Sequence, residues 1–282
     1  MLDAQWFSEP LESDGSAFSL KIKRKLHEEQ SEFQFLEIYE TEHFGNLMVI
    51  DGCTMVSTRD NFFYHEMISH PVLYTHPNPK NVLIIGGGDC GTLREVLKHL
   101  GVERAVQIDI DERVTRLAEI YFPELCESNN DPRAELKFID GIKWVKDAAP
   151  NSIDIIIVDS TDPVGPAEGL FCAEFYKDCF KALTENGIVV QQSESPLLHM
   201  KILAEMRGEM QVAGFNHHQT VFFPQCIYPS GWWSATMASK SAFAPFREQD
   251  AANKGFETVY YNSEIHKASL AMPEFFKKAF AK

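Results

Sequence analysis

The sequence lacks the features that mark several large classes of protein. No apolar stretch in its 282 residues approaches the roughly 20 residues that a membrane-spanning helix requires. Residues 1–10 contain neither the basic region nor the apolar run of a secretory signal, and no repeat or low-complexity tract is visible. We therefore expect a folded protein of the cytoplasm that does not enter a membrane.

Basic residues are also scarce. The chain has 26 Lys and Arg against 41 Asp and Glu, which gives a formal charge of −15. Such a surface repels phosphate backbones and anionic lipid, so neither nucleic acid nor a membrane surface is an expected partner. The same charge suits a cationic ligand, although acidic surfaces more often serve solubility.

The six cysteines include no C-x-x-C pair, the spacing typical of zinc sites and redox pairs. We expect these cysteines to be reduced and mostly buried. His65 and His70 lie five residues apart, whereas the metalloprotease motif places two histidines four apart on one helical face. We therefore expect no bound metal.

The first part of the chain has the hydrophobic pattern of β-strands. Apolar and polar residues alternate, as in strands with one solvated face, at 18–26, 32–40, 46–50 and 53–58. Asp51-Gly52, between the last two runs, predicts the tight turn of a hairpin. Residues 1–68 therefore predict a small antiparallel β domain.

From residue 81 onward, short apolar runs alternate with amphipathic segments, the pattern of parallel strands covered by helices on both faces. The predicted strands are 82–85, 105–110, 136–139, 153–158 and 187–191, followed by 219–223 and 233–238. A helix is predicted after the first of these strands, where Leu93, Val96, Leu97 and Leu100 recur at helical spacing. Further predicted helices lie near 112–121, 142–148, 171–184 and 197–212. Residues 69–282 therefore predict a Rossmann-like α/β domain, although segment 61–74 fits either domain.

Each of the first four predicted strands of this α/β domain has an aspartate at or shortly after its carboxyl end. These residues are Asp89, Asp109, Asp140 and Asp159. Open α/β sheets bind ligands at the carboxyl ends of their strands. One aspartate there usually caps a helix, but four on one edge repel one another unless a cation or hydrogen-bond donors offset the repulsion. This edge is therefore the predicted ligand site.

The turn after the first of these strands favours a nucleoside without phosphates. Gly86, Gly88 and Gly91 fit G-x-G-x-x-G, which leaves a dinucleotide site open. However, Asp89 lies within the turn, where a pyrophosphate would rest. A nucleoside held by glycine backbone and by Asp109 at its ribose avoids that repulsion. Asp89 also repels the carboxylate of S-adenosylmethionine, whereas it suits the protonated aminopropyl arm of the decarboxylated compound.

Longer strings carry a family resemblance. The most specific are Tyr64-His65-Glu66-Met67, Ile84-Ile85-Gly86-Gly87-Gly88-Asp89 with Leu93-Arg94-Glu95-Val96, and Asp159-Ser160-Thr161-Asp162-Pro163-Val164-Gly165-Pro166. Phe44-Gly45-Asn46, Ile50-Asp51-Gly52 and Tyr228-Pro229-Ser230-Gly231 match as well. From Trp6 to about Lys240 the chain resembles the polyamine aminopropyltransferases, the family of the spermidine synthases.

The resemblance implies transfer of an aminopropyl group from decarboxylated S-adenosylmethionine, a co-substrate, to putrescine, giving spermidine and methylthioadenosine without a metal. By position, Asp159 is expected to accept a proton and Tyr64 to orient the attacking nitrogen. The residues expected around the nucleoside are Gln34, Gly86, Gly88, Asp109, Asp140, Gly141 and Pro166. Those expected along the polyamine channel are His65, Asp89, Asp159, Ser160, Thr161, Asp162 and Tyr228. The implied fold is a small N-terminal β domain on a methyltransferase-like sheet, in a homodimer or homotetramer.

Some positions depart from the family pattern. Cys90 stands where glycine or alanine is more usual, which we expect to be tolerated if its φ is negative. Asp109 stands where many members have Glu, which shortens the reach to the ribose by one methylene. Trp232-Trp233 lies near the expected far end of the acceptor, so cadaverine or agmatine stays open as an acceptor. Residues 241–282 have no assigned role beyond closing the fold.

Two other functions stay open. An amine N-methyltransferase would use intact S-adenosylmethionine, whose carboxylate Asp89 opposes. A dehydrogenase or a non-catalytic nucleotide-binding module would leave the string from Asp159 to Pro166 without a purpose. A spermidine synthase is the function that the sequence favours.

Overall fold

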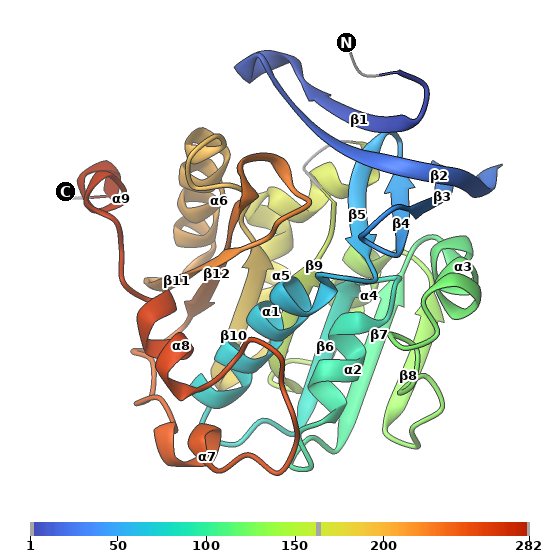
Figure 1. Ribbon diagram of the computed structural model, residues 1–282. Coiled ribbons are helices and arrows are strands. Elements are labelled where there is room, and N and C mark those ends of the chain that lie inside the picture. The colour runs from blue at the N-terminus through green and yellow to red at the C-terminus, as the bar shows by residue number, and fades with distance from the viewer. Residues whose placement is uncertain (1–2, 162–164, 281–282) are drawn as a thin grey trace.

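The chain forms two β-sheets joined by a helix (Figure 1). The computed structural model describes residues 3–161 and 165–280. The first sheet is antiparallel, with strand order β1-β2-β3-β4-β5. Its strands are β1 (Trp6–Leu11), β2 (Ser16–Gln30), β3 (Phe35–Thr41), β4 (Asn46–Ile50) and β5 (Cys53–Ser57). Asp51 and Gly52 have φ of 49° and 85°, so they form the predicted hairpin turn between β4 and β5.

The second sheet has the order β11-β12-β10-β9-β6-β7-β8. Its strands are β6 (Asn81–Gly86), β7 (Arg104–Asp109), β8 (Ala134–Phe138), β9 (Ile153–Asp159), β10 (Leu183–Gln192), β11 (His217–Pro224) and β12 (Trp232–Ser239). The five strands from β10 to β8 are parallel, whereas β12 runs antiparallel to β10 and to β11. The chain winds outward in both directions from β6, so a ligand cleft is expected beside that strand.

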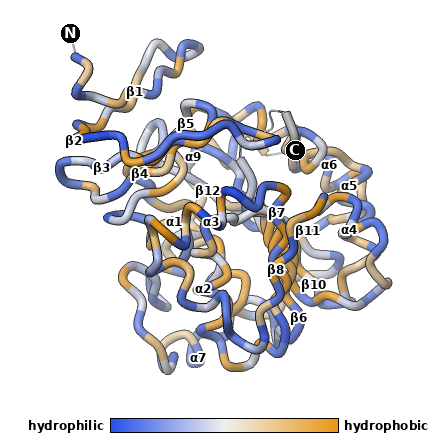
Figure 2. The backbone as a smooth tube through the Cα atoms, turned by 90° about the vertical axis from the view of Figure 1, so that its right-hand side faces the viewer, coloured by the Kyte–Doolittle hydropathy of each residue, from blue (hydrophilic) through white to orange (hydrophobic). Residues whose placement is uncertain are grey.

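Helices cover both faces of the second sheet. On one face lie α1 (Asn61–Thr75) and α2 (Gly91–Leu97), and on the other α4 (Gly141–Asp147), α5 (Ala173–Ala182) and α6 (Met200–Ala213). Helix α3 (Glu112–Tyr121) packs against strands of the first sheet. The middle residues of the central strands β6 and β9 are apolar, at Val82–Ile85 and Ile155–Val158, because both faces of these strands are buried. Figure 2 shows hydrophobic segments gathered in this sheet.

The C-terminal segment is tied to the middle of the fold. It contains α7 (Glu248–Ala252), α8 (Ser263–Ser269) and α9 (Glu274–Phe280). The carboxylate of Glu66, in α1, accepts hydrogen bonds from the backbone N–H groups of Val259, Tyr260 and Tyr261 at 2.7–2.9 Å. The segment therefore closes the face of the sheet that α1 covers, which gives residues 241–280 a structural role.

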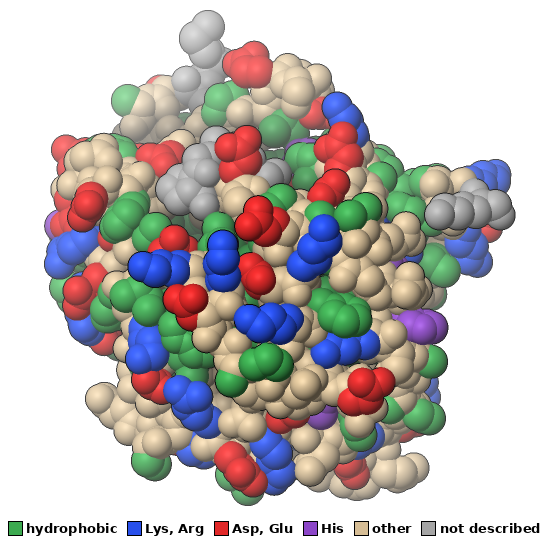
Figure 3. Space-filling model, turned by 180° about the vertical axis from the view of Figure 1, so that it is seen from behind, with side chains coloured by type: hydrophobic (Ala, Val, Ile, Leu, Met, Phe, Trp, Pro, Cys, Tyr) green, Lys and Arg blue, Asp and Glu red, His purple; other side chains and the backbone are tan. Residues whose placement is uncertain are grey.

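Surface charge is mixed on the back of the molecule. Acidic and basic side chains are interspersed there, with few contiguous hydrophobic groups (Figure 3). Among residues 3–161 and 165–280, no helix combines the length and apolar character needed to cross a membrane.

The predicted fold class is confirmed: a small antiparallel sheet accompanies a Rossmann-like, mostly parallel sheet. Sequence patterns missed β1 and the helices of the C-terminal segment, and they left α1 unassigned. Most residues of α1 are buried, so it has little of the amphipathic contrast by which a helix is recognised. The expectation that the cysteines are mostly buried is wrong. Cys90 and Cys179 are buried and Cys126 is partly buried, whereas the remaining three, Cys53, Cys172 and Cys226, are exposed.

Candidate active site

A cavity of about 740 Å³ lies where the first sheet meets the carboxyl ends of β6, β7 and β9. It brings together thirteen of the fifteen predicted site residues: Gln34, Tyr64, His65, Gly86, Gly88, Asp89, Asp109, Asp140, Gly141, Asp159, Ser160, Thr161 and Tyr228. Asp162 lies outside the described residues, and the side chain of Pro166 is not described. The predicted residues, which come from distant parts of the chain, therefore share one site.

Glycine allows the first turn to pass close to the end of β9. Gly86 pairs with Asp159 in the parallel register, and the Gly87 N–H donates to the Asp159 carbonyl at 2.8 Å. A Cβ atom on Gly86 would lie 2.0 Å from that carbonyl oxygen, and φ of Gly86 is 81°. Both facts require glycine at this position. The close approach places the Asp159 side chain directly beside the turn.

Asp159 is a carboxyl group held by two hydroxyl donors. Tyr64 Oη donates to Oδ1 and Thr92 Oγ1 to Oδ2, each at 2.6 Å. Burial and the nearby charge of Asp89 raise the pKa of Asp159, although the hydroxyl donors and His65 oppose the rise. Burial beside Asp159 also raises the pKa of Tyr64, so the phenol remains a donor at neutral pH. A fixed carboxylate with a raised pKa is suited to accept a proton.

Asp89 and His65 form a second polar pair in the cavity. His65 Nε2 lies 3.1 Å from Asp89 Oδ2, and the Gly91 N–H donates to Oδ1 at 2.8 Å. Burial acts to raise the pKa of Asp89, but His65 and the Gly91 amide outweigh it, so that pKa lies below its usual value. Burial acts to lower the pKa of His65, but Asp89 and Asp159 outweigh it and raise that pKa. The cavity thus contains an ionised carboxylate that favours a cationic group.

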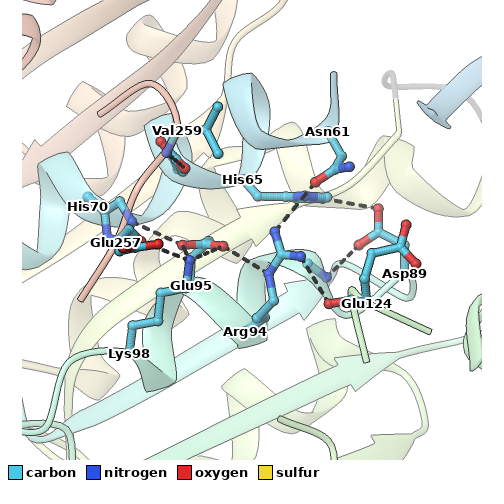
Figure 4. Close-up of polar contacts among 12 residues, drawn as sticks. Asn61, His65, His70, Asp89, Arg94, Glu95, Lys98, Glu124, Glu257 and Val259 are labelled. Carbon is cyan, nitrogen blue, oxygen red and sulfur yellow. Dashed lines mark hydrogen bonds and ion pairs between the residues drawn. The ribbon is translucent and has the colours of Figure 1, made fainter. Parts of the chain in front are cut away.

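Arg94 packs behind this pair, between α1 and α2 (Figure 4). Its Nε donates to Glu95 Oε1 at 2.9 Å and its Nη1 to the Glu124 carbonyl at 3.0 Å. Its Nη2 donates to Asn61 Oδ1 at 3.4 Å. The guanidinium therefore joins the start of α1, which carries His65, to α2.

The charge of Arg94 also acts on the polar pair. It contributes to the lowered pKa of Asp89 and opposes the raised pKa of His65. Sequence reasoning assigned Arg94 no role, although the residue lies in the matched string Leu93-Arg94-Glu95-Val96. The position of Arg94 in that string was the sequence signal that could have identified it as part of the site.

The side of the cavity that is predicted to hold the nucleoside centres on Asp109, at the end of β7. Burial is the main cause that raises its pKa to about 6, and the charges of Asp111 and Asp159 add to the rise. A Cβ atom on Gly88 would lie 2.7 Å from Asp109 Oδ2, so a larger residue there would displace the carboxylate. Gln34 Nε2 donates to Asp111 Oδ2 at 3.1 Å, and Asp111 also caps α3 through the Arg113 N–H. Asp111 therefore fixes Gln34 beside Asp109.

Asp140 and Gly141 line the same side. Asp140 Oδ1 accepts from the N–H groups of Ile142 and Lys143, so Asp140 is the N-cap of α4. A Cβ atom on Gly141 would lie 2.7 Å from Ile85 Cγ2, which favours glycine there. The N-cap hydrogen bonds are a sufficient structural reason for an aspartate at this position. Asp140 also lies in the cavity wall, where a ligand can reach it.

The opposite end of the cavity is aromatic and amide-lined. Tyr228 Oη donates to the Met55 carbonyl at 2.7 Å, which links this end to β5. Trp233 Nε1 donates to Gln192 Oε1 at 3.2 Å, and both side chains line the cavity. Trp232 instead packs against rings on the other side of its strand. Only the second tryptophan of the pair therefore faces the site.

Cys90 does not meet the condition under which we expected it to be tolerated, a negative φ. Its φ is +69°, in the left-handed region. The Cys90 N–H donates to the Gly87 carbonyl at 2.8 Å and α2 begins at the next residue, so the tight turn imposes this conformation. Among the described residues, no group of three or more His, Cys, Asp and Glu side chains is arranged to hold a metal ion.

Comparison with known proteins gives concordant matches. Residues 61–248 match the family described as "Spermine/spermidine synthase domain", and residues 5–57 match "Spermidine synthase tetramerisation domain". The polyamine aminopropyltransferase of Methylococcus capsulatus is 67% identical over 280 residues, covering 99% of this chain and 98% of that protein. The polyamine aminopropyltransferase of Nitrosococcus oceani is 62% identical, covering 97% of this chain and 96% of that protein.

Two solved structures are also similar. A spermidine synthase in complex with the transition state analogue AdoDATO superposes with a TM-score of 0.94 at 37% identity, covering 99% of this chain and 95% of that one. The spermidine synthase of Thermotoga maritima gives a TM-score of 0.92 at 37% identity, covering 99% and 94%.

Proposed function

Because the chain belongs to the spermine/spermidine synthase family, it is a polyamine aminopropyltransferase of the spermidine synthase type, and we propose how its residues carry out the transfer. The reaction moves the aminopropyl group of decarboxylated S-adenosylmethionine to putrescine, giving spermidine and methylthioadenosine. The observation that carries the proposal is the position of Asp159, which is held by Tyr64 and Thr92 beside the ionised Asp89 in one cavity.

On the donor side, we assign the nucleoside to the wall around Asp109. An ionised carboxylate accepts hydrogen bonds from both ribose hydroxyls, while Gln34 and the backbone of Gly86 and Gly88 border the sugar. Asp140, Gly141 and Pro166 are assigned to the adenine.

Asp89 is assigned to the aminopropyl amine of the donor. Its lowered pKa keeps it ionised at neutral pH, and a charged hydrogen bond in a partly desolvated site is stronger than a neutral one. Intact S-adenosylmethionine would bring its own carboxylate toward Asp89. His65, which faces Asp89 at 3.1 Å, completes this pocket.

On the acceptor side, Asp159 is the proposed proton acceptor. A primary ammonium has a pKa near that of Lys, roughly 10.4, and must lose a proton before it can attack. The raised pKa of Asp159 brings it closer to the pKa of the acceptor ammonium. The positive charge of the donor sulfonium also disfavours the charged ammonium form of the acceptor. Tyr64 orients the attacking nitrogen. The other residues assigned to the acceptor channel are Ser160, Thr161, Asp162 and Tyr228.

The neutral nitrogen then attacks the methylene carbon in line with the sulfur. A C–N bond forms, the C–S bond breaks, and the electron pair of that bond remains on sulfur. Holding both substrates in one cleft supplies roughly 7–11 kcal/mol of the barrier, and general-base help adds typically 10²–10⁴-fold. Positioning is therefore the larger contribution.

We further propose an oligomer, a homodimer or homotetramer, in which residues 1–68 act as an assembly domain beside the catalytic domain 69–282. The match of residues 5–57 to a tetramerisation domain supports this assignment. A cytoplasmic location is also proposed, since the six thiols suit a reducing compartment.

A product assay tests the function. The protein is incubated with putrescine and either decarboxylated or intact S-adenosylmethionine, and methylthioadenosine, spermidine and methylated amine are quantified by mass spectrometry. Methylthioadenosine and spermidine from the decarboxylated donor alone support the proposal. A methylated amine from the intact donor would support the N-methyltransferase alternative, and a faster reaction with cadaverine or agmatine would reassign the acceptor.

A further inference from the structure

Two cysteines meet beneath the turn that carries Asp89. Cys90 is fully buried, and its Sγ lies 3.6 Å from the Gly88 carbonyl oxygen. Cys126, which follows α3, places its Sγ 3.7 Å from the Asp89 carbonyl oxygen and is partly buried. The two thiols therefore lie against consecutive carbonyl groups of one turn, and the Cys90 thiol acts to raise the pKa of Cys126. The proposed reaction uses neither thiol.

The backbone conformation of Cys90 is unusual for a residue that has a side chain. At φ +69° and ψ 2°, an L-residue with a side chain is less stable by about 1–2 kcal/mol than in the right-handed region. Glycine would adopt the same turn without that cost. What the cysteine adds is its thiol, which lies on the same turn as the Cys126 thiol and accepts a hydrogen bond from Gln107 Nε2 at 3.5 Å.

We infer that Cys90 and Cys126 form an oxidative modification site, at which a low-molecular-weight disulfide such as glutathione disulfide converts the two thiols to one protein disulfide. Cys126 reacts first because it is partly exposed. Its thiolate attacks one sulfur of the reagent and releases one glutathione thiolate. Cys90 then displaces the second glutathione from the mixed disulfide. The protein loses two electrons and two protons, and the reagent is reduced to two glutathione thiols.

The surroundings of Cys126 make the oxidation of this cysteine pair slow. The Cys90 thiol and burial raise the pKa of Cys126, and the thiolate is the reactive form. We therefore expect modification over sustained exposure to oxidant, with a rate that increases as the pH rises. The product is protected once formed, because Cys90 is inaccessible to external thiols until the bond opens.

The consequence for activity rests on the proposed function. A disulfide fixes the two sulfur atoms about 2.05 Å apart, closer than two thiols can approach without a covalent bond. Closing that gap draws the Cys90 backbone toward Cys126 and moves Asp89, the preceding residue, relative to His65. A misplacement of about 1 Å in such a site can cost about 100-fold in rate. We expect a loss of that order in kcat/KM for the decarboxylated donor.

The test uses the full-length protein, first reduced and then incubated with glutathione disulfide. Non-reducing peptide mapping measures the Cys90–Cys126 cross-link, and kcat/KM for the donor is measured before oxidation, after it, and after dithiothreitol. Cys126→Ser is the matched variant, because serine preserves a donor to the Asp89 carbonyl and cannot form the cross-link. Cys172→Ser removes an exposed thiol outside the cavity and serves as the control.

The expected result is a Cys90–Cys126 cross-link in the wild type and in Cys172→Ser, with a loss of activity that dithiothreitol reverses and that Cys126→Ser does not show. The inference is overturned if oxidation forms no such cross-link, if cross-linked enzyme keeps its kcat/KM, or if Cys126→Ser loses activity equally. An inactive reduced wild type would count against the proposed function instead, and peptide mapping would still report on the disulfide.

Discussion

Replacing Gly91 with alanine should disable the donor site and leave the rest of the fold intact. Gly91 is the first residue of α2, and the His65 ring lies against it. An alanine Cβ would lie 2.2 Å from His65 Cε1 and 2.3 Å from Nδ1. Since the backbone here also supplies the N–H group that binds Asp89, the ring must move rather than the helix.

The size of that movement follows from the contact distances. An ordinary contact begins near 3.4 Å, so the ring must shift by about 1.2 Å, the difference from 2.2 Å. That shift breaks the 3.1 Å contact between His65 Nε2 and Asp89 Oδ2. A displacement of this size in a positioned site can cost about 100-fold. We therefore expect kcat/KM for the decarboxylated donor to fall by about that factor.

The assay is methylthioadenosine release at saturating putrescine, with thermal unfolding measured in parallel. Gly208→Ala is the matched control, because a Cβ atom at Gly208 meets nothing within 4 Å. This control should keep full activity and gain about 0.5–1 kcal/mol of stability, since alanine is the better residue within a helix.

A double-variant cycle separates the steric effect from damage to the helix. In a His65→Ala background there is no ring to displace, so Gly91→Ala should cause little further loss. If Gly91→Ala alone keeps the wild-type kcat/KM, or if its loss is equally large without the His65 ring, the account of the Asp89 pocket is wrong.

Three further predictions concern separate parts of the molecule. Asp159→Asn should lower kcat by about 10²–10⁴-fold with the unfolding temperature unchanged, because it removes the proposed proton acceptor; turnover within a few-fold of wild type in a stopped assay would exclude that role. The pKa of Asp109, raised to about 6, predicts that KM for the donor rises as the pH falls below about 6, since protonation removes the proposed acceptor for the ribose hydroxyls; Asp109→Asn should abolish this pH dependence, and a flat wild-type profile would contradict it. Glu66→Gln should lower the free energy of unfolding by about 2–3 kcal/mol, because an amide cannot accept all three backbone N–H groups that the buried carboxylate binds; an unchanged urea midpoint would show that this contact contributes nothing.

The strand-end aspartates were predictable because topology places them. Parallel strands with apolar runs must bring their carboxyl ends to one edge, so Asp89, Asp109, Asp140 and Asp159 were expected to converge, and all four line the cavity. The roles of these residues remain proposals.

Contacts between distant segments could not be read from local patterns. The polar groups that fix the site come from elsewhere in the chain: Thr92 binds Asp159, Asp111 binds Gln34, and Arg94 connects α1 to α2. Hydrophobic periodicity reports only which face of an element is buried, so it says nothing of such pairings. The positive φ of Cys90 likewise follows from the tight turn, which a propensity for cysteine does not predict.

The central claim is that the charge of Asp89 selects the decarboxylated donor. Isothermal titration with the decarboxylated and the intact nucleoside, in the wild type and in Asp89→Asn, tests it most directly, since the variant keeps the size of the side chain and removes its charge. We expect the wild type to prefer the decarboxylated donor and Asp89→Asn to lose about 10- to 100-fold of that preference, the value of a charged hydrogen bond of about 1.5–3 kcal/mol. Equal binding of both donors by the wild type, or an unchanged preference in Asp89→Asn, would contradict the claim.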